Sequence, residues 1–392
     1  MPYLRCWVVI SAPDKWYNFM TCKHFNLLNL KREILKKTML GFHRTYTTPF
    51  KAKISASVDD YFRRVSIFRR FNRFIGRYLY AEIALRKNKK IDKITDKHQR
   101  ILWIQWVDSY LGDSLMDLSS RVLIQDKRID LLTKENVAKI YQGDIFFSNI
   151  YSDPGQCTNN DYDLIIIDSY RQRSLKMITR NFPSLPYISL YGYYNVDDFN
   201  RLYFSFHRVN QWLLNPHDDS YIENIAKPTL PITSNDINLV ENLQLPDNFM
   251  TIAIGGANKE RTFHLWSDLI DKIRESQILD SIVLIGSKQA KNEAKFIIQK
   301  APDVVLNMVG KCTFQQSAQI IKKSTMLICA DGGLLHAANA VNTPIVGLFY
   351  YIDPQTRLIA LNKSYGLVDK NSINNISINK IVEKIKFLKE GM

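Results

Sequence analysis

The turn Asp331-Gly332-Gly333 is the segment of this sequence whose residue types and position are best suited to bind an anion. It separates a predicted strand, Met326–Cys329, from a predicted helix, Leu334–Val341, so its amides lie at the positive end of a helix dipole. Two glycines let a phosphate group approach the main chain closely. His336 falls on the first helical turn, within reach of the same ligand. The alternative is structural, with Asp331 as the helix N-cap and His336 as a packing residue.

A competing signal is Asp161-Tyr162-Asp163, which has the D-x-D form that metal-dependent sugar transferases use to hold a divalent ion. It directly precedes a predicted strand, where acidic turn residues are common, and no donor-binding residues surround it. We therefore expect no metal site. The sequence has no G-x-G-x-x-G after the first strand of either half, no Walker sequence and no G-x-S-x-G, which counts against dinucleotide, P-loop and serine-nucleophile sites.

These residues are embedded in an alternation of short β-branched or aromatic runs with longer amphipathic runs, which indicates parallel sheets with helical crossovers. In the first half the pattern predicts strands at Ile101–Val107, Ile129–Thr133, Asp144–Tyr151, Asp163–Ser169 and Pro186–Tyr193, and helices at Asp113–Ile124 and Lys134–Tyr141. In the second half it predicts strands at Phe249–Ile254, Ser281–Ile285, Val304–Asn307, Met326–Cys329 and Pro344–Phe349, and helices at Leu265–Glu275, Lys288–Gln299, Thr313–Lys323, Leu334–Val341 and Ile378–Leu388.

The segment Ala226–Asn248 interrupts this alternation with three prolines and is interpreted as an interdomain linker. We predict a basic, partly helical N-terminal extension at 1–98, a Rossmann-like domain at 99–232 and a second Rossmann-like domain at 233–392. Two such domains place a ligand in the cleft between them, at the carboxyl ends of the strands. Glycosyltransferases, epimerases and dinucleotide enzymes share this architecture, so function has to come from the site.

The charge of the chain is concentrated at its N-terminus. Of 392 residues, 53 are Lys or Arg and 38 are Asp or Glu, a net +15, but residues 1–100 hold 23 basic against 7 acidic residues. Within Tyr61–Leu79, apolar residues recur at helical spacing with arginines on the opposite face. We expect a membrane-surface helix with contacts from Arg63, Phe68, Arg70, Phe71, Arg73 and Arg77. Packing of this helix on the protein itself is equally compatible, and nucleic-acid binding lacks any reader motif.

The cysteine pattern and the hydropathy indicate a reducing compartment and no membrane span. Five cysteines form no C-x-x-C pair, and no window approaches about 18 uninterrupted apolar residues. The N-terminus does not have the form of a signal peptide, because charged residues closely follow its short apolar run. We expect a cytoplasmic protein, peripheral on an inner membrane surface, whose translation begins at either Met1 or Met39.

Several motifs together resemble one family from about residue 100 to the end. The runs Asp331-Gly-Gly-x-x-His336-Ala-Ala-x-Ala340, Pro344–Phe349 and Asp353-Pro354 resemble the C-terminal signature of bacterial glycosyltransferase family 9, the ADP-heptose:lipopolysaccharide heptosyltransferases. Gly310–Thr313 resembles its G-K-T-S-L element, and Gly255-Gly256-Ala-Asn-Lys259 with Trp266 resembles its phosphate-binding lysine and following helix. Gly112-Asp113 resembles its I-G-D turn after the first strand.

The resemblance implies a GT-B fold and an inverting, metal-independent transfer of a sugar, heptose by family default, from a nucleotide diphosphate to a lipopolysaccharide core acceptor. It implies Asp113 as the base that accepts the acceptor hydroxyl proton, with a simple N-cap as the alternative. It also implies a donor site that needs no cofactor and is formed by Gly255, Gly256, Lys259, Arg261, Asp331, Gly332, Gly333 and His336. Lys259 supplies charge to the diphosphate unless it is an exposed loop residue, in which case Arg261 takes that part.

The sequence departs from the family at three places. Gly332 stands where members usually have Ser, Phe349-Tyr350-Tyr351-Ile352 stands where they have Phe-Gly-Pro-Thr, and the Leu-Pro after Gly112-Asp113 is missing. These changes leave the fold prediction intact and leave the sugar open. Two alternatives to a transferase therefore stay open: a GT-B nucleotide-sugar epimerase, and a degenerate homologue that binds a nucleotide sugar without turnover.

Overall fold

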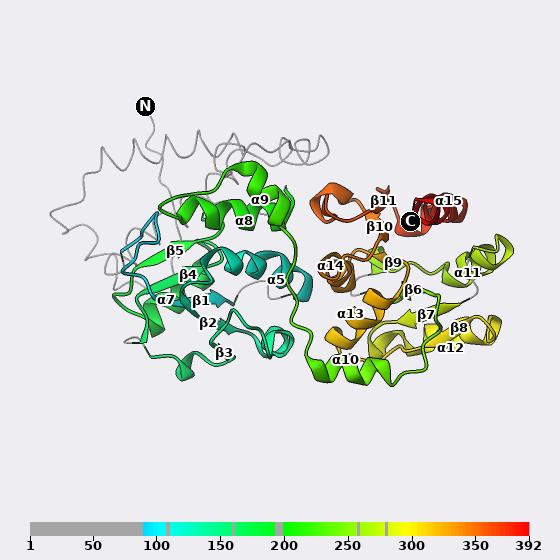
Figure 1. Cartoon of the computed structure of the whole chain (residues 1–392), viewed down its shortest axis with the longest axis horizontal. Coiled ribbons are helices and arrows are strands. Elements are labelled where there is room, and N and C mark those ends of the chain that lie inside the picture. The colour runs from blue at the N-terminus through cyan, green and yellow to red at the C-terminus, as the bar shows by residue number, and fades with distance from the viewer. Residues whose placement is uncertain are drawn as a thin grey trace, which may run out of the picture. The chain divides into compact units, whose positions relative to one another are not determined.

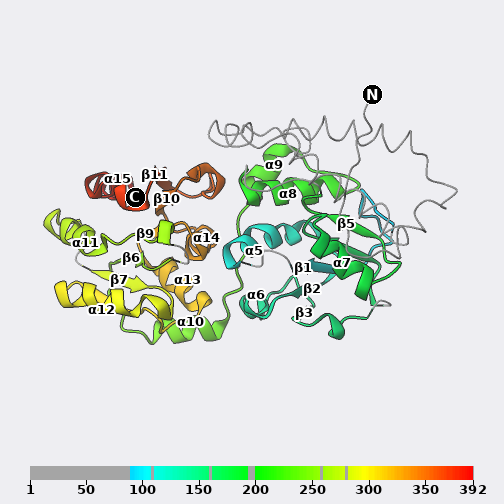
Figure 2. The same ribbon diagram turned by 180° about the vertical axis from the view of Figure 1, so that it is seen from behind.

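Two parallel β-sheets form the framework of the chain (Figures 1 and 2). The computed structural model describes residues 89–106, 110–158, 161–192, 199–256, 259–278 and 281–391. The predicted membrane-contact residues, Arg63 to Arg77, lie outside these residues. Within the part that is described, no helix is long and apolar enough to cross a membrane.

The first sheet has the strand order β3-β2-β1-β4-β5. Its strands are β1 (Arg100–Gln105), β2 (Arg128–Thr133), β3 (Asn149–Tyr151), β4 (Leu164–Ile167) and β5 (Tyr187–Ser189). The chain winds outward in one direction from β1 to β3 and then crosses back to β4 on the other side of β1. The carboxyl ends of β1 and β4 therefore form a topological switch point, where doubly wound sheets bind ligands.

The second sheet repeats this winding with the order β11-β10-β9-β6-β7-β8. Its strands are β6 (Met250–Ala253), β7 (Ile282–Ile285), β8 (Val305–Asn307), β9 (Leu327–Ala330), β10 (Ile345–Tyr350) and β11 (Ser364–Asp369). Here the switch point lies between β6 and β9, which pair in parallel. The segments that leave these two strands, 254–262 and 331–336, are the glycine-containing segments identified in the sequence.

Helices cover both faces of the first sheet because successive strand residues point to opposite sides. Ile101 and Trp103 of β1 pack with α5 (Leu111–Leu118) and α8 (Arg201–Trp212) on one face, while Leu102 and Ile104 pack with α7 (Gln172–Asn181) on the other. The smaller helices of this half are α6 (Glu135–Ala138) and α9 (Asp219–Ile225). The core is therefore continuous from the sheet to the helix that carries Asp113.

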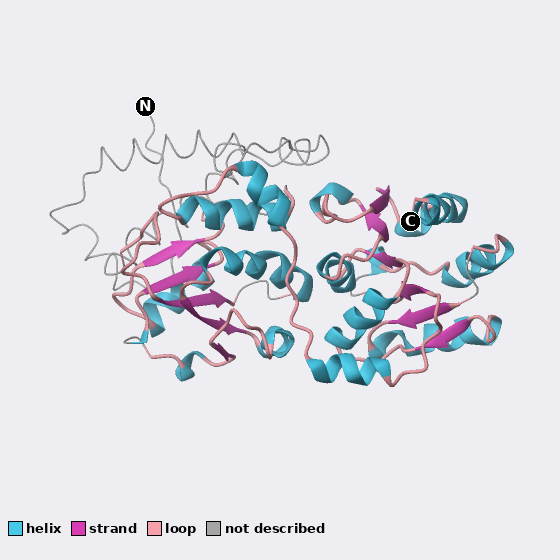
Figure 3. Cartoon of the chain, in the orientation of Figure 1, coloured by secondary structure: helices cyan, strands magenta, loops and turns pink. Residues whose placement is uncertain are grey.

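The second sheet is covered in the same way (Figure 3). One face packs against α11 (Trp266–Glu275), α12 (Lys291–Lys300) and α15 (Ile378–Glu390), and the other against α10 (Ser234–Glu241), α13 (Phe314–Lys323) and α14 (Gly333–Ala340). Short 3₁₀ segments lie at Ser119–Ile124, Lys139–Tyr141, Pro154–Gln156, Lys259–Arg261, Lys288–Ala290, Pro354–Thr356 and Ile373–Asn375. The predicted doubly wound architecture is confirmed for both halves.

Two local expectations are wrong. The predicted strand Asp144–Tyr151 is extended only at β3, because the Asp144 carboxylate accepts hydrogen bonds from the Phe146 and Phe147 amides and pairs with the buried Arg121. The predicted linker contains α10, whose N-cap Thr233 forms a capping box with Asp236. The edge strand β11 was not predicted.

Candidate active site

Asp331 leaves the end of β9 and lies at the N-terminus of α14, but its side chain does not cap this helix. The N-cap residue is Gly332, with extended backbone angles and no side-chain hydrogen bond to the helix. The Asp331 carboxylate, 6% exposed, lies between two arginines instead. Its Oδ2 is 3.3 Å from Arg261 Nη1 and its Oδ1 is 3.8 Å from Arg357 Nε. Two guanidinium groups against one carboxylate leave a net positive charge at a helix N-terminus, which favours an anion.

Arg261 reaches this position because the chain folds back sharply after β6. Gly255 has φ +88, a conformation that favours glycine. A Cβ atom on Gly256 would lie 2.6 Å from Thr262 Oγ1 and 3.2 Å from the Arg261 carbonyl oxygen, so only glycine permits this close approach. Lys259 is exposed on the same turn and makes no ion pair with any described residue. The turn thus directs Arg261, rather than Lys259, to Asp331.

Arg357 was not predicted, and it comes from the loop that follows β10. Asp353 starts this loop by accepting a hydrogen bond from the Gln355 amide, and Asn339 of α14 donates to the Arg357 carbonyl oxygen at 3.1 Å. The Arg357 side chain is 14% exposed. Within the described chain its guanidinium donates only to the carbonyl and hydroxyl oxygens of Thr356, both through Nη1. A guanidinium has five N–H donors, so most of its hydrogen-bonding capacity is available for a ligand.

His336 is buried at the same helix end, with 3% of its surface exposed. Burial, with a smaller contribution from the nearby charge of Arg357, lowers its pKa to about 3. The imidazole is therefore neutral at neutral pH, and its Nδ1 has no hydrogen-bond partner among the described residues. A Cβ atom on Gly112 would lie only 2.6 Å from His336 Cδ2. The N-terminal turn of α5 is thus packed directly on the N-terminal turn of α14.

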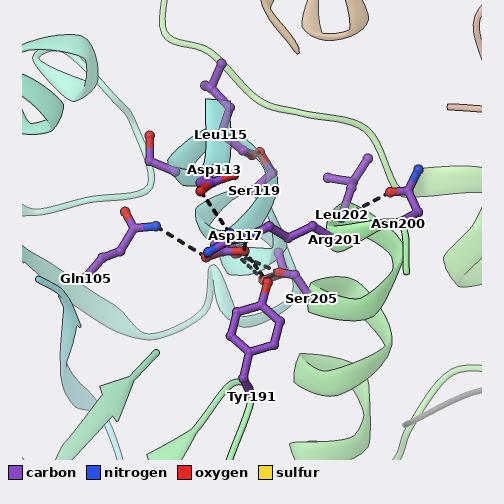
Figure 4. A network of polar contacts seen from close by, with 12 residues as sticks. Gln105, Asp113, Leu115, Asp117, Ser119, Tyr191, Asn200, Arg201, Leu202 and Ser205 are labelled. Atoms are coloured by element: carbon purple, nitrogen blue, oxygen red, sulfur yellow. Dashed lines mark hydrogen bonds and ion pairs between the residues drawn. The ribbon is translucent and has the colours of Figure 1, made fainter. Parts of the chain in front are cut away.

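Asp113 follows Gly112 and is the third residue of α5, not its N-cap, which is Tyr110. Its Oδ2 is 3.0 Å from Nη1 of Arg201, at the start of α8 (Figure 4). The Asp113 carboxylate is also near enough to His336 to act on its pKa, so it lies near the N-terminus of α14. The predicted base and most of the predicted donor-binding residues are thus brought to one region of the molecule.

A second carboxylate, Asp117, holds Arg201 in place. Arg201 donates to Asp117 through Nε and Nη2, both at 2.6 Å. The Tyr191 hydroxyl donates to Oδ1 of the same carboxylate, and Gln105 Nε2 donates to Oδ2 at 3.4 Å (Figure 4). Asp117 is 1% exposed, so a bidentate arginine and further donors compensate its buried charge. The network fixes the guanidinium whose remaining nitrogen contacts Asp113.

Asp168, at the end of β4, is a further buried carboxyl group near the first switch point. Only 7% of the residue is exposed, and burial raises its pKa to about 6. Acidic groups with perturbed pKa values concentrate at functional sites, although structural carboxyl groups share this property. We interpret Asp168 as a structural group of the first half rather than as a reacting group, because among the described residues no hydrogen bond or ion pair joins it to Asp113.

The D-x-D segment lies at the opposite edge of the sheet. Asp163 precedes β4 and binds Arg100 at 2.8 Å, while Asp161 binds the Thr158 hydroxyl. The intervening Tyr162 donates to Asp130 at 3.0 Å. These acidic groups therefore serve local structure. Among the described residues, no group of three His, Cys, Asp or Glu side chains is arranged to hold a metal ion.

Comparison with known proteins relates the second half of the chain to one family. Residues 230–385 match the model of glycosyltransferase family 9 (heptosyltransferase). A segment of 115 residues is 27% identical to lipooligosaccharide heptosyltransferase 2 of Haemophilus influenzae. The aligned segment covers 28% of this chain and 31% of that protein. The chain thus spans about a third of the length of this curated relative.

Solved structures show the same fold over most of the chain. The crystal structure of a family 9 glycosyltransferase from Veillonella parvula has a TM-score of 0.62 at 14% identity, covering 76% of this chain and 100% of that one. The Escherichia coli ADP-heptose lps heptosyltransferase II has a TM-score of 0.57 at 15% identity, covering 74% and 99%. The predicted GT-B architecture is confirmed.

Proposed function

We propose that this chain, whose residues 230–385 match the glycosyltransferase family 9 model, transfers a sugar from a nucleotide-diphosphate donor to a hydroxyl group of a lipopolysaccharide core acceptor. The observation that carries the proposal is the packing of the Gly112-Asp113 turn on the N-terminus of α14, where Arg261 and Arg357 converge. Displacement of a diphosphate by a hydroxyl group requires a base and an anion-binding site on either side of the reacting sugar carbon, and two neighbouring helix ends can supply them. Heptose is the sugar that the similarity to heptosyltransferases favours.

In this proposal the diphosphate of the donor binds at the N-terminus of α14. Arg261 and Arg357 donate to its oxygens, and the amides near Gly332 and Gly333 add the dipole of the helix. These groups stabilise the negative charge that develops on the leaving diphosphate. We therefore propose that catalysis needs no metal ion, because arginines and a helix end supply the positive charge. Lys259 is exposed on the preceding turn, and we propose that it contributes to donor binding less than Arg261 does.

Asp113 serves as the general base. Its carboxylate takes the proton of the acceptor hydroxyl group while the acceptor oxygen bonds to the anomeric carbon and the bond from this carbon to the diphosphate oxygen breaks. Attack opposite the leaving group inverts the anomeric configuration. Arg201 keeps the carboxylate oriented through its contact at 3.0 Å. A lipid-linked acceptor suits a protein that works at the inner face of the membrane, with residues 60–90 as the contact, which is a proposal from the sequence.

Nucleotide binding tests the donor site. In EDTA, ADP at 100 times its dissociation constant should stabilise the protein by about 2.7 kcal/mol in thermal unfolding, and UDP and GDP less. Arg261→Ala should weaken ADP binding about tenfold, because it removes a charged donor to the diphosphate. Arg274→Ala, an exposed arginine on α11, is the matched control and should bind as the unchanged protein does. The proposed donor site would be contradicted if ADP binding required Mg²⁺, or if Arg261→Ala left the ADP affinity unchanged.

A further inference from the structure

Asn200, the N-cap of α8, makes hydrogen bonds in two directions. Its Oδ1 accepts from the amides of Leu202 at 3.1 Å and Tyr203 at 3.4 Å, which caps the helix (Figure 4). Its Nδ2 donates to two carbonyl oxygens in the other half of the chain, those of Gln355 at 3.1 Å and Leu358 at 2.8 Å. Serine and aspartate cap helices as well as asparagine does, but only asparagine also carries amide donors. The second function explains why this residue type suits the position.

The two carbonyl groups bracket Arg357. Asn200 therefore holds the loop on both sides of the arginine that faces Asp331. The Tyr203 hydroxyl, one turn further along α8, accepts a hydrogen bond from the Ala360 amide at 3.0 Å. The N-terminus of α8 thus fixes the loop from the first half of the molecule, while Asn339 holds it from the second.

This attachment matters because Arg357 has unused donors next to a helix N-terminus. A loop that is free to move must be ordered when a ligand binds, and the lost conformational freedom weakens binding. A loop held in advance avoids this cost. The effect belongs to donor binding, since the loop itself carries no group that contacts Asp113.

We propose that Asn200 is a positioning residue for the donor: it orients Arg357 for the diphosphate from the half of the molecule that carries the base. The inference rests on the proposed function, because it assumes a nucleoside diphosphate at the N-terminus of α14. Arg201, the next residue, contacts Asp113. Asn200 therefore holds the loop that carries Arg357, and the next residue, Arg201, holds the base. Donor binding and orientation of the base thus both depend on the N-terminus of α8.

A graded series at one position separates this role from simple capping. Asn200→Ser keeps the cap and removes the two interhalf hydrogen bonds, and should weaken ADP binding five- to tenfold in calorimetry with the full chain. Asn200→Asp also keeps the cap but points a carboxylate at two carbonyl oxygens, and should weaken ADP binding further. If Asn200 acts only as a cap, all three residues should give the same affinity.

A double-mutant cycle tests whether the effect passes through Arg357. In an Arg357→Ala protein, Asn200→Ser should cause no further loss of ADP affinity, because the residue that it orients is gone. The inference would be overturned if the unchanged, Asn200→Ser and Asn200→Asp proteins bound ADP with equal affinity. It would also be overturned if Asn200→Ser reduced ADP affinity as much in the Arg357→Ala protein as in the unchanged one. If the unchanged protein binds none of ADP, UDP and GDP, the proposed function fails and this inference fails with it. If the unchanged protein binds ADP but the Asn200→Ser and Asn200→Asp proteins bind it equally well, only the inference is refuted.

Discussion

Two buried titratable side chains, His336 and Asp168, respond to burial in opposite ways. Burial lowers the pKa of His336 to about 3 and raises that of Asp168 to about 6. The histidine is uncharged near neutral pH and adds no charge beside Arg357. The aspartate is mostly ionised at pH 7 although it is buried, which costs stability. A destabilising charge retained beside a switch point is consistent with a functional surface there.

The cost at Asp168 can be measured through its pH dependence. Because the folded pKa lies above the unfolded value of 3.8, the folded state binds more protons between about pH 4 and pH 6, so stability falls as pH rises through this window. Asp168→Asn should therefore stabilise the protein at pH 7, by at most about 3 kcal/mol, and the gain should vanish near pH 4. Thermal unfolding from pH 4 to pH 8 gives the result.

Asp163→Asn is the matched control, because this residue precedes the same strand and hydrogen bonding to Arg100 lowers its pKa. Stability from such a group is present above its unfolded pKa and is lost as pH falls, so this variant should be less stable at pH 7. An Asp168→Asn protein that is less stable than the unchanged one at pH 7 would contradict this prediction, and would show that hydrogen bonds to the carboxylate outweigh its burial.

Individual residues were predictable from the sequence where a short motif contains them. Asp331 and His336 lie within one such run, and Arg261 follows a glycine turn. Arg201 and Arg357 were not predicted, because their partners lie far along the chain and no local pattern records such a contact. One local signal existed: Asp113 and Asp117 are four residues apart and face the same side of α5.

At the scale of elements, the contact between α5 and α14 joins the two halves of the site. Gly112 is required because a methyl group there would lie 2.6 Å from the ring of the buried His336. Gly333 also tolerates little, since its Cβ would lie 3.3 Å from the Phe314 ring. Gly332, by contrast, is extended and its Cβ would meet nothing closer than 3.9 Å.

Gly112→Ala should force the two helix ends apart. Overpacking of this kind costs about 1–3 kcal/mol, so the unfolding temperature should fall by several degrees. The weakened contact should also reduce ADP affinity, because His336 and the start of α14 shift. Gly332→Ala is the control on the neighbouring element and should unfold within about 1 °C of the unchanged protein. If both variants unfold alike, the close approach of α5 and α14 is not a feature of the protein in solution.

Strand and helix identity followed from apolar periodicity wherever an element is buried on a sheet, as for β1, β9 and α13. Apolar periodicity gave wrong predictions where polar side-chain contacts determine the backbone conformation. The Asp144 side chain takes up the amides that a strand would use, and the capping box at Thr233 starts α10 inside a proline-marked segment. The strand β11 is only partly buried, so it lacks the strong apolar run of an interior strand.

For the whole molecule, each sheet supplies one part of the proposed reaction. The segments after β6, β9 and β10 of the second sheet provide Arg261, Asp331 and Arg357. The helix α5, after β1 of the first sheet, provides Asp113. Residues 1–100 carry a net charge of +16 (23 basic, 7 acidic), whereas the rest of the chain carries −1 (30 basic, 31 acidic). The site is therefore positive through local placement of arginines rather than through the charge of the whole protein.

Sugar transfer by the unchanged protein and by Asp113→Asn, with Arg274→Ala as control, tests the central claim most directly. With ADP-heptose and a lipopolysaccharide core that lacks heptose, in EDTA, we predict that the unchanged protein and the control release ADP only when the acceptor is present. Asp113→Asn should bind ADP within about twofold of the unchanged protein but transfer about 10²- to 10⁴-fold more slowly, because a general base contributes a factor of this size. Transfer by Asp113→Asn at the unchanged rate would contradict the account.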